Sequence, residues 1–246
     1  MIGRIALRMA TIEVLRGKTA VDQNVLDSRM TALDAGADGV LKTDQKKPFI
    51  AVYTDDAKVE GGMEARSLHK SGPTALVIEI AIAESMLYRN ELNDVEVVAG
   101  IPDADDAYEF ILDVIGRQIT NALTDPGDEW AELWRSLSSR IVKIERKRTS
   151  DASGVRIAAH QLIITLDLLP DPVFGEPLAT GSTWAKFFAK ISQEGMPRGI
   201  ASRVSLLQAL IGTPDGVEDH EAQRRRYGLT IAEARAMLDT SVLPEV

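Results

Sequence analysis

The chain has 246 residues, of which 45% are hydrophobic and 26% charged, and its formal net charge is −9. This length and composition suit one or two globular domains with an ordinary core. The acidic balance argues against a nucleic-acid-binding protein, which needs a basic surface to attract phosphates. The absence of cysteine excludes disulfides, thiolate metal sites and a cysteine nucleophile. We expect neither a signal peptide nor a membrane span, because no apolar run approaches roughly 18 residues.

The first residues predict an amphipathic helix over Ile2–Leu15, because apolar side chains recur there at helical spacing. Gly17 is the expected C-cap of this helix. Arg4 and Arg8 lie four residues apart on a different face. A solvated surface is the simpler interpretation of these two arginines. The alternative is a basic strip that meets acidic groups of a neighbouring subunit.

Two strands are predicted before residue 57. One is short and lies within residues 21–29; the other covers residues 48–56, where bulky and β-branched residues follow a proline. Residues 31–46 between them are rich in turn formers. The polar residues 57–72 contain a glycine pair and predict a hairpin arm or a loop.

Residues 74–86 predict a long strand around which the first domain is organised. Four aliphatic residues at period two, from Leu76 to Ile82, form an apolar face suited to a core. The opposite face carries Val77, Glu79 and small residues, so we expect it to meet a helix or another subunit. Glu79 is interpreted as an interface or helix-facing acid.

A helix is predicted to begin with Asp103 as N-cap and to run to Leu123. Asp105 and Asp106 would lie in its first turn, where the helix dipole favours negative charge. Tyr108, Ile111, Ile115 and Ile119 are its expected apolar stripe. Three further elements are predicted before the first domain ends: a helix over residues 130–138, a strand with a basic flank over residues 140–148 and a strand over residues 155–169.

Three prolines within residues 170–177 end the strand pattern and predict a linker. Beyond it the pattern is helical, and Thr230 with Glu233 forms the capping box of a last helix. We therefore predict an α/β domain over residues 1–170 and a helical extension over residues 171–246. The expected fold class is α/β (α+β): a mixed, mostly antiparallel sheet packed by helices, with a C-terminal helical extension.

The sharpest enzymatic alternative is a metal-dependent nuclease, which holds magnesium between an Asp at one strand end and a Glu-x-Lys on the next strand. Asp55 or Asp56 could be the first carboxylate and Glu79 the second, but Ala81 stands where the lysine belongs. The net charge also opposes a nucleic-acid substrate. We therefore expect no enzymatic activity and no catalytic, cofactor-binding or metal-binding residues.

Three other polar features have simple interpretations. His69, His160 and His220 are far apart in sequence, and His160, on the apolar side of a strand, is expected to be a satisfied core or interface histidine. The aspartates at residues 103–106 lack the spacing of a calcium loop. The arginines at residues 224–226 lack an aromatic ladder and are interpreted as a solvated or subunit-facing cluster.

Several segments, taken in order, match one known family. The most specific is residues 48–54 (Pro-Phe-Ile-Ala-Val-Tyr-Thr), which follows residues 24–29 (Asn-Val-Leu-Asp-Ser-Arg). The others are the N-terminal helix, residues 66–68, the strand at residues 76–82, the helix at residues 108–123 and the strand at residues 155–169. In this order of elements the first 170 residues resemble the tail terminators of tailed bacteriophages. Residues 171–246 extend beyond the compact members of that family.

The resemblance implies a structural virion protein, assembled in the host cytoplasm and located in the tail or neck. It would form a homo-oligomeric ring, commonly a hexamer, that caps the tail tube, ends its polymerisation and meets the head completion or connector protein. DNA would pass through the pore without sequence-specific binding. The alternative is another head–tail joining or tube-like component of the same virion. Candidate subunit contacts are Arg4, Arg8, Arg66, His69 and Glu79.

Overall fold

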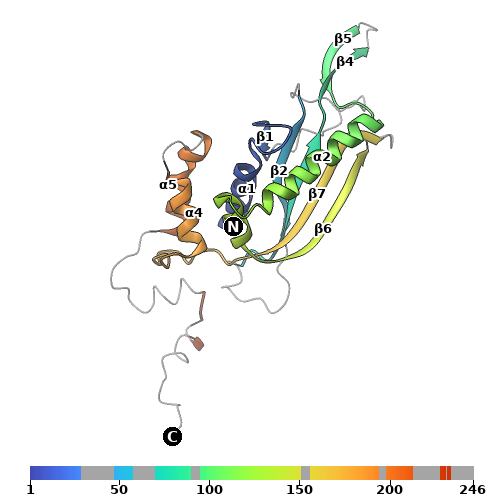
Figure 1. The fold of residues 1–246 in the computed structure, drawn as a ribbon. Coiled ribbons are helices and arrows are strands. Elements are labelled where there is room, and N and C mark those ends of the chain that lie inside the picture. Colours follow the sequence, from blue (N-terminus) through green and yellow to red (C-terminus); the bar gives the residue numbers. More distant parts are fainter. Residues whose placement is uncertain are drawn as a thin grey trace, which may run out of the picture. The chain divides into compact units, whose positions relative to one another are not determined.

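The computed structural model describes residues 1–28, 47–57, 70–89, 95–150, 156–193, 198–212, 228–230 and 232–233, which contain five helices and seven strands. Figure 1 shows these elements coloured along the chain. The chain divides into two compact units. The larger consists of residues 4–57 and 73–168, and the smaller of residues 1–3, 58–72 and 169–246.

A five-stranded mixed sheet, in the order β1-β2-β3-β7-β6, forms the larger unit (Figure 1). The strands are β1 (Val25–Asp27), β2 (Phe49–Ala57), β3 (Pro73–Ala81), β6 (Ser138–Ser150) and β7 (Arg156–Leu168). β1 and β2 are parallel, and all other neighbours in this sheet are antiparallel. The predicted fold class, an α+β protein with a mixed and mostly antiparallel sheet, is confirmed.

The central strand β3 is buried on both faces. Leu76, Ile78 and Ile80 form the predicted apolar face, and Val77 and Glu79 are buried on the other. Helix α2 (Asp106–Leu123) packs across β3 and β7. Its buried side chains, which supply the helical half of this core, are Leu112, Ile115, Ile119, Ala122 and Leu123.

Helix α1 (Ile2–Leu15) has the predicted bounds. Gly17 follows it with a φ of 69°, a left-handed conformation that glycine adopts without strain. Burial is wider than the predicted stripe, because Leu7, Thr11 and Val14 are also fully buried. The Thr11 hydroxyl donates to the carbonyl of Leu7 at 2.7 Å, which satisfies a buried polar group.

The chain just after α1 is tied to α2 and to the short helix α3 (Glu129–Ser136). The side-chain oxygen of Gln118 accepts a hydrogen bond from the backbone of Ala20 at 2.8 Å. Lys18 forms an ion pair at 2.6 Å with Asp128, whose carboxylate also caps α3. These bonds hold the C-terminal ends of α1 and α2 together beside the start of α3.

Residues 74–86 do not form the single strand that the sequence predicts. β3 ends at Ala81, and β4 (Glu84–Arg89) pairs instead with β5 (Val95–Gly100) in a separate two-stranded sheet. Alternation of residue types continues through Ile82 and Ala83 into β4. Period two therefore cannot show where the chain leaves the larger sheet.

The start of α2 also differs from the prediction. Asp105, not Asp103, is the N-cap, and its carboxylate accepts from the backbone of Tyr108 at 2.8 Å. Asp103 forms a backbone bridge to Ile157, so it still belongs to the sheet side of the junction. Ile115 and Ile119 of the predicted stripe are buried, but Leu112 is buried in place of Ile111, which is 39% exposed.

In the smaller unit, α4 (Thr183–Ile191) and α5 (Arg198–Ile211) lie where the sequence predicts helices. Trp184, Phe187 and Phe188 make edge-to-face ring contacts and form its aromatic centre. The predicted capping box is present: Glu233 accepts from the backbone of Thr230, and the Thr230 hydroxyl accepts in return. Residues 224–226 lie outside the described part. Among the described helices, none is long and apolar enough to cross a membrane.

Candidate functional site

The predicted contact residues Arg4 and Arg8 both have partners within the larger unit. The Arg4 guanidinium donates to the carbonyl oxygens of Thr54 at 2.8 Å and Asp55 at 2.6 Å. Arg8 Nε lies 2.6 Å from the carboxylate of Asp27. These bonds tie α1 to β2 and β1. Arg66 and His69, with His220, lie outside the described residues.

Glu79 is a buried residue at the centre of a partly buried polar cluster. Its Oε1 accepts a hydrogen bond from the Tyr53 hydroxyl at 2.6 Å and another from Gln161 Nε2 at 3.0 Å. The strand register explains this grouping, since Glu79 stands opposite Ala51 on one side and Gln161 on the other. Glu79 is 6% exposed, and its Oε2 has no hydrogen-bond partner in the described structure.

The geometry around Glu79 is that of a sheet-stabilising cluster. Asp55 and Asp56, the other carboxylates of the nuclease alternative, stand near the far end of β2 from the Ala51–Glu79 pair. Over the residues that the structure describes, no group of three or more potential ligands could hold a metal ion. The one bonded carboxylate oxygen of Glu79 is shared by two neutral donors, Tyr53 and Gln161.

This cluster predicts a specific pH dependence. Burial, and then the hydrogen bond to Glu79 and its charge, hold the pKa of the Tyr53 hydroxyl well above its usual value of about 10. Above pH 10 the unfolded chain therefore releases this proton while the folded chain keeps it. The stability that Tyr53 contributes is complete below pH 10 and is lost as the pH rises through the folded-state pKa.

The Tyr53→Phe variant tests this dependence. We expect it to be about 1 kcal/mol less stable at pH 7, because one hydrogen bond is lost. Between pH 9 and pH 11 its stability should fall less steeply than that of the wild type. Urea unfolding across this range measures both effects, and parallel slopes for the two proteins would refute the pKa argument.

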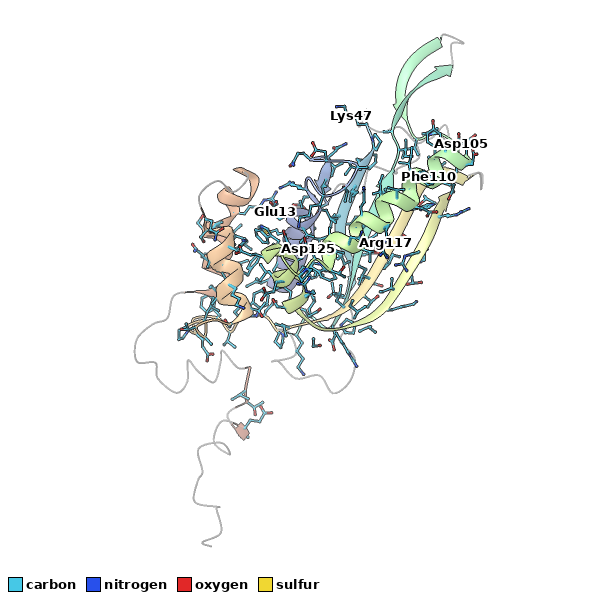
Figure 2. All side chains as sticks on the ribbon, in the orientation of Figure 1. Glu13, Lys47, Asp105, Phe110, Arg117 and Asp125 are labelled. Atoms are coloured by element: carbon cyan, nitrogen blue, oxygen red, sulfur yellow. The ribbon has the colours of Figure 1, made fainter. Side chains whose placement is uncertain are left out.

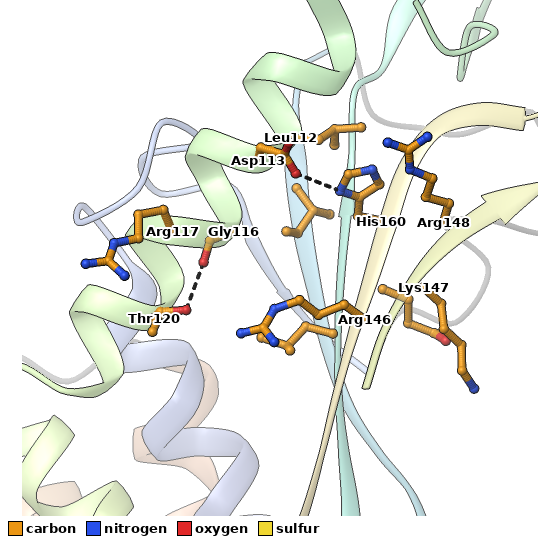
Figure 3. A pocket seen from close by; sticks show the side chains of 12 residues that line it. Leu112, Asp113, Gly116, Arg117, Thr120, Arg146, Lys147, Arg148 and His160 are labelled. Atoms are coloured by element: carbon orange, nitrogen blue, oxygen red, sulfur yellow. Dashed lines mark hydrogen bonds and ion pairs between the residues drawn. The ribbon is translucent and has the colours of Figure 1, made fainter. Parts of the chain in front are cut away.

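A second candidate site is a cavity of about 460 Å³ in the larger unit, between α2 and strands β6 and β7 (Figure 3). We call it the α2–β6 cavity. Ile80, Leu112 and Leu162 give it an apolar floor. Its other lining residues are mostly polar or charged: Asp113, Gly116, Arg117, Thr120, Arg146, Lys147, Arg148, His160 and Gln161.

His160 is a satisfied histidine at one end of this cavity. Its Nε2 lies 3.1 Å from the carboxylate of Glu109, which also pairs with Arg148 at 2.8 Å. Its Nδ1 lies 3.9 Å from the carboxylate of Asp113 (Figure 3). Two carboxylates of α2 thus face His160 and Arg148 at this end of the cavity.

The other end of the cavity has basic side chains without acidic partners. Neither Arg117 nor Arg146 forms an ion pair with any residue in the described ranges, and both are exposed. Arg146 lines this cavity from β6, and Arg117 and Thr120 line it from α2 (Figure 3). In a chain with a net charge of −9 these two unpaired arginines are a local positive surface.

Gly116 of α2 lines this cavity, and because glycine has no side chain the space beside it is empty. A Cβ added there would meet no heavy atom within 4 Å. We therefore expect Gly116→Ala to raise the free energy of unfolding by about 0.5–1 kcal/mol, because alanine is the better helix former. Chemical denaturation measures the change. A loss of stability would show that the helix needs glycine at this position.

The surface beside the cavity exposes several large apolar side chains. Phe110 on α2 is 70% exposed, and Val114, one turn later, is 36% exposed. On β6, Ile141, Val142 and Ile144 are each about half exposed. Among the described strands β6 has a neighbour, β7, on one side only, so it is an edge strand of this sheet. Sequence alone indicated the basic character of β6 but not the cavity, which depends on how α2 crosses the sheet.

Comparison with known proteins assigns no family to the chain. No protein-family model matches it, and no curated protein matches its sequence. The fold and its surfaces define an α+β protein with an open sheet edge and a partly basic cavity beside that edge.

Proposed function

We propose that this protein is a ring-forming structural component of a bacteriophage tail or neck, of the tail-terminator type. The observation that carries the proposal is the free edge of the sheet. β6 has 13 residues, pairs with β7 alone among the strands that the structure describes, and exposes three aliphatic side chains. A long edge strand with exposed apolar residues is a surface that proteins usually cover. A neighbouring subunit would cover it.

The order of elements supports the same class of protein. A helix, a short strand, a strand preceded by proline, a central strand, a helix and a final long strand occur in this order in the chain, with β4 and β5 before α2 and with α3 and β6 after it. Such a ring would cap the tail tube, end its polymerisation and meet the head connector. A net charge of −9 suits a pore through which DNA slides without being bound.

The test is the assembly state of the full-length protein. We expect light scattering after size-exclusion chromatography to give a closed oligomer, and negative-stain images to show rings with a central pore. Mixed with tail-tube protein, the rings should stand at tube ends and stop tube growth. A monomer at every concentration, with no binding to tube protein, would refute the proposal.

An edge-strand variant tests the observation itself. Ile144→Lys places a charge on a side chain that is 47% exposed, so we expect the melting temperature to change little. Assembly should weaken, because a lysine on an edge strand opposes pairing with another chain. Asn121→Lys, at an exposed position of α2 that does not line the cavity, is the comparison variant. Unchanged assembly of Ile144→Lys would exclude this part of β6 from the contact.

A further inference from the structure

We infer that the α2–β6 cavity receives the acidic N-terminal end of α2 from a second copy of this chain. The inference rests on the proposed ring function and names the two surfaces that would meet. One is the basic end of the cavity, with Arg117 and Arg146. The other is the start of α2, with Asp103, Asp106 and Phe110.

The receiving surface combines charge with an apolar floor. Arg117 and Arg146 have no acidic partner in the described part of the chain, although the whole chain carries nine more acidic than basic residues. Beneath them lie Ile80, Leu112 and Leu162. The space above Gly116 is open. Such a surface favours a group that brings both negative charge and apolar area.

The start of α2 has those two properties. Asp103 and Asp106 are exposed, and neither carboxylate forms a hydrogen bond or ion pair within the described residues. Phe110, one turn after Asp106, is 70% exposed. Figure 2 shows Asp105 and Phe110 toward one end of α2 and Arg117 further along the same helix. Buried aromatic side chains are the usual anchors of protein interfaces.

A second copy suits the cavity better than nucleic acid does. The apolar floor formed by Ile80, Leu112 and Leu162 suits an aromatic side chain such as Phe110 and offers no partner to a phosphate chain. Every copy carries both the acidic patch and the basic patch, on different parts of the surface. A contact between two different patches is heterologous, and repeated contacts of this kind close into a ring when the rotation permits.

Charge reversal tests the contact on the full-length chain. Sedimentation velocity over a concentration series at low salt compares the wild type with Arg146→Glu, Asp106→Lys and the double variant. Each single reversal should weaken association roughly tenfold or more, because like charges then meet. The double variant restores opposite charges across the contact and should recover most of the loss. Lys47→Glu, a reversal at an exposed lysine before β2, is the matched control.

The outcomes separate this inference from the ring proposal. Circular dichroism and melting temperature first establish that each variant is folded. If the wild type assembles and both single variants assemble equally well, the inference is overturned and the ring stands. If the single variants are folded and the double variant associates as weakly as they do, the pairing of Arg146 with Asp106 is also overturned. A wild type that remains monomeric overturns both proposals. A charge-rescued complex that stops at two copies supports the contact and overturns the ring.

Discussion

The Glu79→Ala variant is expected to lose about 2 kcal/mol of unfolding free energy. Alanine removes the carboxylate oxygen that accepts from Tyr53 at 2.6 Å and from Gln161 at 3.0 Å. A donor left without an acceptor in a buried setting costs about 1–3 kcal/mol. Removal of Oε2, which has no partner in the described structure, offsets part of this loss. Chemical denaturation at pH 7 measures the net change.

Two comparison variants show whether the loss of stability in Glu79→Ala comes from its hydrogen bonds. Glu79→Gln keeps an acceptor for the Tyr53 hydroxyl, so we expect it to retain most of the stability. Glu145→Ala removes a glutamate from β6, where its partners Lys143 and Lys147 are exposed, and should change stability by less than about 0.5 kcal/mol. Equal losses at the two glutamates would contradict the role of the cluster.

Glu79→Ala also distinguishes the polar cluster around Glu79 from a metal site. Removing one of several carboxylates that hold a metal relieves repulsion in the metal-free protein, so such a variant would be no less stable. Added magnesium would then raise the melting temperature of the wild type but not of Glu79→Ala. We expect no such difference, because Glu79 is bonded to two neutral donors.

Local patterns in the sequence were sufficient for elements that local forces determine. The bounds of α1 follow from helical spacing and from Gly17, whose φ of 69° suits glycine. Alternation along β3 correctly assigned its apolar face, including Leu76 and Ile78. The capping box at Thr230 depends on two residues three apart. Each of these features involves residues that are close in the chain.

Features that depend on distant residues were not predictable. The end of β3 at Ala81 follows from where its partner strands end, and alternation continues past that point. Asp105 prevails over Asp103 as N-cap because Asp103 is held by a bridge to Ile157, more than 50 positions away. The sequence predicted Asp103 as N-cap and put Asp105 in the first turn, because the contact to Ile157 leaves no local pattern.

The candidate sites also combine features that local patterns predict with features that depend on distant residues. The pattern placed Glu79 on the non-core face of its strand, but its partners Tyr53 and Gln161 come from two other strands and depend on register. The α2–β6 cavity requires the crossing of α2 over the sheet, which no local pattern encodes. Arg146 could be recognised in the sequence only as one member of a basic strand.

The Phe49→Ala variant is expected to show the largest loss of stability, about 3–5 kcal/mol. Phe49 is fully buried at the start of β2, the strand that carries the most specific part of the resemblance. Truncation removes the transfer free energy of the ring and leaves a cavity that the surrounding sheet only partly fills. Urea unfolding at neutral pH measures the loss, and a change below about 1 kcal/mol would show that the neighbouring side chains collapse into the space.

Phe110→Ala is the matched control, because it makes the same chemical change on a side chain that is 70% exposed. An exposed ring gives up little burial, so its removal should change the free energy of unfolding by less than about 0.5 kcal/mol. The substitution should instead weaken association, since the aromatic ring of Phe110 is available to a second copy. Phe49→Ala thus tests the core at any protein concentration. Phe110→Ala should differ from the wild type in its association but not in the stability of the single chain. If Phe110→Ala and the wild type assemble equally well, Phe110 is not part of the contact.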